Sequence, residues 1–286
     1  MPEKPPDIEK RMFVVGSGRC GSTLLQVLLG SHPNILAFPE TFFFDRLAGG
    51  VLGSLLRAGV PMAPTRVALA RVREEIGDCA SGPLEPGRFM GPSAAIDCFR
   101  EMLDRHTLEA GKGIWVEKTP SHLDYIELIQ RHLPDAHFVH VLRDGLEVVA
   151  SIRRRARNYP TIFRNQESYR HSTRRWNRAI RTSARYADQA NHTIISYEQL
   201  VADTEGELRR ICGEAQFDFD SRMLSPRADV AEYVAPEERP WLKGAHGPVV
   251  AAKLRFGELF KPDEQARICK RLELDLYEKL LAESYA

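Results

Sequence analysis

Residues 16–23 have the types and spacing of a loop that binds phosphate or sulfate. A short apolar run precedes them and apolar residues at helical spacing follow, which predicts a strand, a glycine loop and a helix in that order. Glycines let backbone N–H groups turn toward an anion, and a helix N-terminus adds partial positive charge. The nucleotide-triphosphatase P-loop requires lysine where Ser22 stands. Here Arg19 supplies the cation, and its planar donor fork suits two-point binding of oxyanions.

A glutamate and a lysine stand together at the end of a second apolar run. Residues 114–116 are typical of a buried strand, and Glu117 and Lys118 follow directly. Ligands bind at the carboxyl ends of strands in α/β sheets, so this pair is a candidate for proton transfer, with a plain surface ion pair as the equal alternative. Glu40, soon after the glycine loop, is another candidate base, although a solvated or capping role is its default.

An arginine ends the next apolar run. Residues 137–142 predict a buried strand that leads into Arg143 and Asp144 and then into a helix. A Mg²⁺-nucleotide enzyme usually has an aspartate directly at such a strand end, whereas here a fixed cation comes first. Asp144 is expected to cap the helix, and Ser151 lies two turns along it.

Composition excludes several classes of protein. The 286 residues are 43% hydrophobic with net charge +1, which indicates a globular chain without a global attraction to nucleic acid or membranes. The five cysteines lack CxxC spacing and are expected to be reduced thiols, with Cys20 as a small loop filler rather than a nucleophile. Residues 1–11 show no secretory signal and no run is long enough for a membrane span, so a cytoplasmic location is expected.

The order of elements predicts an α/β fold with P-loop-like, three-layer architecture, in which helices flank a central, mainly parallel sheet. We expect one domain over residues 1–286. Residues 41–113 are interpreted as a helical insertion between the first and second strands that covers a substrate pocket. The predicted strands are 12–15, 114–116, 137–142 and 192–196, with helices near 65–76, 93–109, 121–133 and 264–283 and a loop-rich segment at 218–245. The arginine-rich stretch 153–185 is either a solvated face with acidic partners or a positive field that attracts an anion.

These motifs, taken in order, resemble the sulfotransferases that use 3′-phosphoadenosine 5′-phosphosulfate (PAPS). The resemblance covers about residues 12–260 and is closest to the bacterial and tyrosylprotein or carbohydrate branch. A segment at 246–259 resembles the C-terminal lid of that family. The motifs are Gly18-Arg19-Cys20-Gly21-Ser22-Thr23-Leu24, Trp115-Val116-Glu117-Lys118-Thr119-Pro120, Val139-His140-Val141-Leu142-Arg143-Asp144-Gly145 with Ser151, and Ile195-Ser196-Tyr197-Glu198-Gln199-Leu200.

The resemblance implies where the donor binds. Arg143 and Ser151 would bind the 3′-phosphate, the group that distinguishes PAPS from ATP, and Tyr197 would lie near the nucleotide. No metal is expected, because the family transfers the sulfuryl group by in-line displacement without one. The 5′-phosphosulfate would be bound by Gly18, Arg19, Cys20, Gly21, Ser22, Thr23 and Leu24.

Two carboxylates compete as the base that the resemblance requires. Glu40 aligns with the glutamate of the tyrosylprotein branch and Glu117 with that of the heparan-type branch; we favour Glu40. Lys118 would then stabilise the leaving phosphate or the transferring group. The tyrosylprotein enzymes have an arginine where Phe42 stands, which argues against an acidic peptide. We therefore expect a small-molecule, glycan or lipid-like hydroxyl (or amine) acceptor, and no nucleic acid partner.

Two alternatives remain at this stage. A P-loop kinase for a small metabolite would need a lysine directly before Thr23 and an aspartate at the end of the third predicted strand, where the chain has Ser22 and Arg143. A non-catalytic nucleotide-binding module would tolerate loss of Glu40, Glu117 and Lys118 together.

Overall fold

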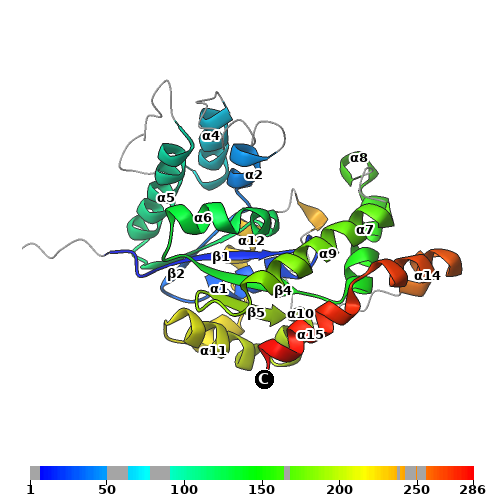
Figure 1. Cartoon of the computed structure of the whole chain (residues 1–286). Coiled ribbons are helices and arrows are strands. Elements are labelled where there is room, and N and C mark those ends of the chain that lie inside the picture. Colours follow the sequence, from blue (N-terminus) through cyan, green and yellow to red (C-terminus); the bar gives the residue numbers. More distant parts are fainter. Residues whose placement is uncertain are drawn as a thin grey trace, which may run out of the picture.

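Five strands form the centre of the computed structural model, which describes residues 7–49, 64–77, 91–163, 168–236, 239–241, 249 and 256–286 (Figure 1). They pair in the order β2-β3-β1-β4-β5, and every pairing is parallel. The strands are β1 (Lys10–Gly16), β2 (Ile35–Phe38), β3 (Ile114–Lys118), β4 (His137–Leu142) and β5 (His192–Ser196). The predicted α/β fold with a flanked parallel sheet is confirmed.

The strands are almost entirely buried because helices cover both faces of the sheet. Successive side chains of a strand point to opposite faces. Met12 and Val14 of β1 therefore pack in one apolar cluster, while Phe13 and Val15 pack in another. The first cluster includes helices α1 (Ser22–Gly30), α11 (Thr204–Ala215) and α12 (Ala228–Val234). The second includes α2 (Phe43–Ala48), α4 (Pro64–Ile76), α5 (Pro92–Glu109) and α6 (Ile126–His132), which lie across the sheet from α1 and α11 in Figure 1.

A third apolar cluster joins the middle of the chain to its C-terminal helices. Trp176 and Tyr277 are buried in it together with Leu142, the last residue of β4. The helices involved are α7 (Gly145–Asn158), α9 (Tyr169–Tyr186), α13 (Phe256–Leu259), α14 (Pro262–Arg271) and α15 (Leu274–Ser284). Short elements α8 (Pro160–Phe163) and α10 (Tyr197–Ala202) follow α7 and β5 respectively.

One strand of the sheet is not among the four predicted ones. Ile35–Phe38 forms β2 and pairs with β3 at the edge of the sheet, from Ile35 opposite Ile114 to Phe38 opposite Glu117. The insertion 41–113 therefore lies between the second and third strands, not between the first and second. Four residues after a proline turn are too short a run for periodicity to identify, and pairing with β3 decides the outcome.

Three helical segments also differ from the prediction. The helix expected over 121–133 begins as a 3₁₀ helix, η1 (Pro120–Tyr125), before α6. The single C-terminal helix expected over 264–283 is α14 and α15, which are separate elements on either side of Leu272 and Glu273. Part of 218–245 is helical, as η3 (Ser221–Leu224) and α12. The lid expected at 246–259 lies largely outside the described residues. No helix in the described part of the chain is long and apolar enough to cross a membrane.

A chain of buried histidines on β4 and β5 predicts acid instability. His140 Nε2 lies 2.8 Å from His192 Nδ1, and His140 Nδ1 lies 2.9 Å from Ser183 Oγ. Burial lowers the pKa of His137 and of His192 to about 4, and lowers that of His140 well below its usual value. The unfolded chain therefore binds protons below about pH 6.5 that the folded chain does not.

The stability that depends on these neutral rings is complete above about pH 6.5 and is lost as the pH falls toward 4. Each ring lowers the free energy of unfolding by up to about 1.4 kcal/mol per pH unit over this interval. Urea unfolding should show a falling free energy of unfolding between about pH 6.5 and pH 5, before most carboxylates titrate. The variant H192Q should show a shallower slope. A free energy of unfolding that does not change over this interval would contradict the prediction.

Candidate active site

The glycine loop joins β1 to α1 at the edge where the parallel strands end. Arg19 has φ of 71° and Gly21 has φ of 96°, both in the left-handed region. A Cβ on Gly21 would lie 2.2 Å from the Tyr197 ring, so this position requires glycine for space as well as for conformation. No side chain caps the first turn of α1. Its N–H groups are thus suited to bind an anion.

Four of the predicted donor-binding residues lie together at this loop. Arg19 Nε donates to Ser151 Oγ at 3.1 Å, and Arg143 Nη1 donates to the Arg19 carbonyl at 3.3 Å. The Arg143 guanidinium lies 4.4 Å above the centre of the Tyr197 ring. Burial, and next the charge of Arg143, lower the pKa of Arg19. Two guanidinium groups this close repel each other, which makes the position favourable for a bound anion.

Surrounding elements determine where these side chains lie. Trp176 of α9 is fully buried and donates to the Arg143 carbonyl at 2.9 Å. Asp144 caps α7 as predicted, because its Oδ1 accepts from the Glu147 N–H at 2.9 Å. Cys20 is buried, and its Sγ would lie 3.0 Å from a Cβ on Gly16, in agreement with a packing role in the loop.

Glu40 and Lys118 form an ion pair beside the loop. Lys118 Nζ lies 2.5 Å from Glu40 Oε1, across a separation of 78 residues. Lys118 is completely buried, whereas the Glu40 side chain is 19% exposed. The negative charge of Glu40 acts to raise the pKa of both Arg19 and Arg155, so it lies within electrostatic reach of the loop.

Glu117 lies in a different environment from its neighbour Lys118. Consecutive residues of β3 point to opposite faces of the sheet, so Glu117 contacts His122 and Thr41 instead of the ion pair. Burial acts to raise the pKa of Glu117, but the His122 ring and the Thr119 and Thr41 hydroxyls outweigh it, and the net pKa lies below its ordinary value. The interpretation of Glu117 and Lys118 as a pair, on the surface or otherwise, is wrong.

The arginine-rich stretch has two roles in the structure. Several of its members form ion pairs away from the loop, namely Arg153 with Glu264, Arg178 with Asp124 and Arg181 with Glu273. Two others lie near the loop. Burial, with the charges of Arg19 and Arg175, lowers the pKa of Arg155 to about 10, and Arg175 Nη2 lies 3.9 Å from the position of a Cβ on Gly18.

Sequence reasoning did not single out Arg155, Arg175, Thr41, Thr119 or His122. Arg155 had a usable signal, because it lies one helical turn after Ser151 and residues at this spacing share a helix face. The contacts of the other four join elements that are distant in sequence, so no local pattern gave them individual roles.

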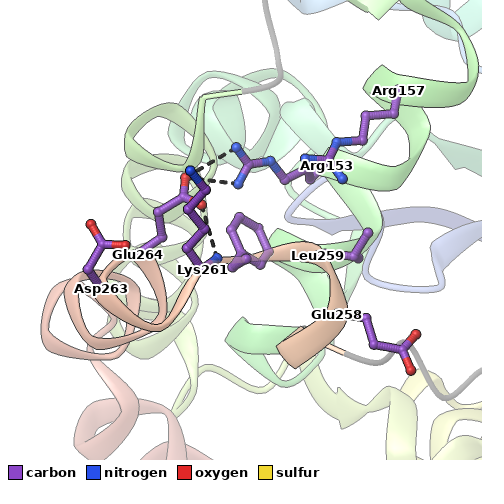
Figure 2. A pocket seen from close by; sticks show the side chains of 8 residues that line it. Arg153, Arg157, Glu258, Leu259, Lys261, Asp263 and Glu264 are labelled. Atoms are coloured by element: carbon purple, nitrogen blue, oxygen red, sulfur yellow. Dashed lines mark hydrogen bonds and ion pairs between the residues drawn. The ribbon is translucent and has the colours of Figure 1, made fainter.

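A separate pocket lies where α7 meets α13 and α14 (Figure 2). Its volume is about 580 Å³, and it is lined by Arg153, Arg157, Glu258, Leu259, Phe260, Lys261, Asp263 and Glu264. None of these is a predicted site residue, and the Arg153 guanidinium is already bound to Glu264 at 3.0 Å. In the part of the chain that the structure describes, no group of three or more His, Cys, Asp or Glu side chains is arranged to bind a metal ion.

The glycine loop, the strand order and the charged residues at the carboxyl ends of the strands together indicate one class of protein. Comparison with models of known protein families identifies that class. The model of the sulfotransferase family matches residues 11–221, and the chain belongs to this family. It is 25% identical over 220 residues to a putative protein-tyrosine sulfotransferase of Caenorhabditis briggsae, covering 76% of this chain and 69% of that protein. It is 26% identical over 202 residues to protein-tyrosine sulfotransferase 1 of Danio rerio, covering 70% of this chain and 51% of that protein.

Solved structures show the same fold at low identity. The sulfotransferase domain of the Synechococcus PCC 7002 olefin synthase has a TM-score of 0.52 and 20% identity, covering 90% of this chain and 95% of that domain. A mouse sulfotransferase, SULT7A1, complexed with PAP has a TM-score of 0.54 and 13% identity, covering 98% of this chain and 90% of that chain. The predicted family and enzyme class are thus confirmed.

Proposed function

We propose that this sulfotransferase transfers the sulfuryl group of PAPS to a hydroxyl (or amine) of a small-molecule, glycan or lipid-like acceptor. The observation that carries the proposal is the convergence of Arg19, Arg143 and Ser151 at the glycine loop, next to the Glu40–Lys118 ion pair. The partly buried Arg19, whose pKa is lowered by burial and by the charge of the buried Arg143, fits a polyanion, and the nearby hydroxyls add hydrogen-bond donors. PAP in the related mouse structure supports this choice of donor.

Each part of the donor has residues of matching chemistry. The loop N–H groups, Arg19 and the hydroxyls of Ser22 and Thr23 would bind the 5′-phosphosulfate. Arg143 and Ser151 would bind the 3′-phosphate. Tyr197 would contact the nucleotide from its position between Gly21 and Arg143, with Gly18, Cys20 and Leu24 completing the loop.

The chemistry follows from the charges beside the loop. Glu40 accepts the proton of the acceptor hydroxyl while the oxygen of that hydroxyl attacks the sulfur of PAPS. The bond from sulfur to the bridging phosphate oxygen breaks, and PAP leaves. Lys118 and Arg19 offset the negative charge that develops on that oxygen. Glu40 is favoured over Glu117 because it is partly exposed and paired with Lys118, whereas Glu117 is completely buried.

Phe42 supports an acceptor that is more apolar than an acidic peptide. It is half-buried directly after the Glu40-Thr41 dipeptide, where the resembling tyrosylprotein enzymes carry arginine. The free hydroxyl of a phenol, a sugar or a lipid-like alcohol is compatible with an aromatic neighbour at this position.

Binding of 3′,5′-adenosine bisphosphate (PAP) tests the donor assignment without an acceptor. Calorimetry should show metal-independent binding of PAP, and the R143A variant should bind PAP about 10- to 100-fold more weakly, because a charged hydrogen bond contributes about 1.5–3 kcal/mol. Affinity for 5′-AMP, which lacks the 3′-phosphate, should change little.

The comparison of PAP with 5′-AMP separates a lost 3′-phosphate contact from general damage to the site. Equal weakening of both ligands would indicate damage, and unchanged PAP affinity would overturn the role of Arg143. Binding of Mg-ATP without binding of PAP would favour the kinase alternative.

A further inference from the structure

Four successive backbone N–H groups after Glu40 are all bonded within one group of buried side chains. This group, here called the Glu117 cluster, consists of Thr41, Glu117, Thr119 and His122, each with 0% exposure. The bonds are Thr41 N to Glu117 Oε1 at 3.1 Å, Phe42 N to Thr119 Oγ1 at 3.3 Å, Phe43 N to Thr41 Oγ1 at 3.3 Å and Phe44 N to His122 Nε2 at 3.4 Å. These N–H groups lie at the start of α2, where helical partners are lacking.

The backbone that the cluster binds is not a relaxed one. Phe42 has φ of 48° and ψ of 27°, a left-handed conformation that a bulky residue rarely adopts. Such a conformation is unfavourable for a bulky residue and persists only where its surroundings hold it in place. The Glu117 cluster holds the backbone of Phe42 in this conformation, because the N–H groups of Phe42 and of both neighbouring residues donate hydrogen bonds to it.

The carboxylate of Glu117 is committed to this task. Oε1 accepts hydrogen bonds from Thr41 N, from Thr41 Oγ1 at 2.8 Å and from Thr119 Oγ1 at 2.6 Å, and Oε2 lies 2.9 Å from His122 Nδ1. With every contact inside the protein and no exposure, the carboxylate lacks access to an acceptor hydroxyl. Its observed contacts are three hydrogen bonds to Oε1 and the charge contact of Oε2 with the His122 ring, all of which hold neighbouring protein groups.

Glu40 is thus bound to β3 in two ways. Lys118 contacts the Glu40 carboxylate directly, and Glu117 binds the backbone N–H of the next residue, Thr41. Adjacent side chains of one strand point to opposite faces, so together they fix both the carboxylate and the turn that carries it.

We propose that Glu117 is a positioning residue, which with His122, Thr41 and Thr119 fixes the turn after Glu40 and so aligns the catalytic base with Lys118. The proposal rests on the proposed function of Glu40. It assigns to Glu117 a purpose that differs from that of a competing base.

The double-mutant cycle of E40Q and E117Q tests the proposal. PAP release from PAPS is measured with 4-nitrophenol as hydroxyl acceptor and with water alone. We expect E117Q to lower kcat by about 10²-fold, the cost of a misplacement on the order of 1 Å, with unchanged affinity for PAP. In the E40Q background the same substitution should have little further effect, because its consequence passes through Glu40. The acid limb of the kcat–pH profile should remain in E117Q and be absent in E40Q.

Hydrogen exchange provides a readout that does not depend on turnover. The N–H groups of residues 41–44 should exchange faster in E117Q and keep their rates in the control E207Q, which alters a buried glutamate bound to Arg210 and Tyr285. If E117Q does not fold, T41A replaces it, and T41S should restore both activity and slow exchange because serine retains the hydroxyl.

The outcomes separate the two proposals. An equal further loss of activity in the E40Q background, or unchanged exchange at 41–44, would overturn the positioning role. Full activity in E40Q with loss of the acid limb in E117Q would instead overturn Glu40 as the base.

Discussion

Replacing Arg19 with alanine is expected to lower sulfuryl transfer by about 10³-fold, to the limit of detection. Arg19 is the cation inside the loop, and it also donates to Ser151, which is predicted to bind the 3′-phosphate. The variant therefore loses charge stabilisation at the bridging oxygen and one link between the two anion-binding ends of the donor site. Release of PAP from PAPS measures the rate, and calorimetry with PAP measures the loss of affinity.

Arg185 offers a matched control for this substitution. It lies exposed in the last turn of α9, which leads to the start of β5. The parallel strands begin at this end of the sheet, whereas the glycine loop lies at the end where they finish. The variant R185A removes the same charge and should keep full activity. Equal activity of R19A and R185A would show that the loop cation has no role in transfer and would exclude the proposed donor geometry.

The second large effect is expected for Glu40→Gln, which should lower kcat by about 10²- to 10⁴-fold. Glutamine keeps the size of the side chain and a contact with Lys118, but it does not accept the acceptor proton at neutral pH. Affinity for PAP should change little, because Glu40 is proposed to act on the acceptor hydroxyl and not to bind the donor. Rates from PAP release, combined with calorimetry on the same protein, separate the two effects.

Glu127 provides the control for Glu40, because it is 83% exposed on α6 and pairs only with Arg131 in the described structure. The variant E127Q should retain full activity. Turnover that survives in E40Q at the rate of E127Q would remove Glu40 from the mechanism and return attention to the remaining carboxylates near the loop.

Local patterns were sufficient to predict the loop and most of the fold. The glycine loop is one continuous segment, so its strand, turn and helix are visible in neighbouring residues. Arg143 was expected near it from the family resemblance, and the parallel register of β1 with β4, which places Gly16 opposite Val141, brings Arg143 to the end of the sheet where the loop lies. Strand β2 was missed because four residues carry little periodicity.

The pairing of charges was not predictable from those patterns. Glu117 and Lys118 are adjacent in the chain, yet one contacts His122 and the other contacts Glu40, because β3 turns its side chains to alternate faces and pairs with both β1 and β2. Residues close in the chain were enough to predict a glycine loop and fixed cations at the ends of strands, because these features depend on local order alone. The tertiary structure alone decided which carboxylate is partly exposed beside Lys118 and which is buried, because that choice depends on contacts across 76 to 78 residues.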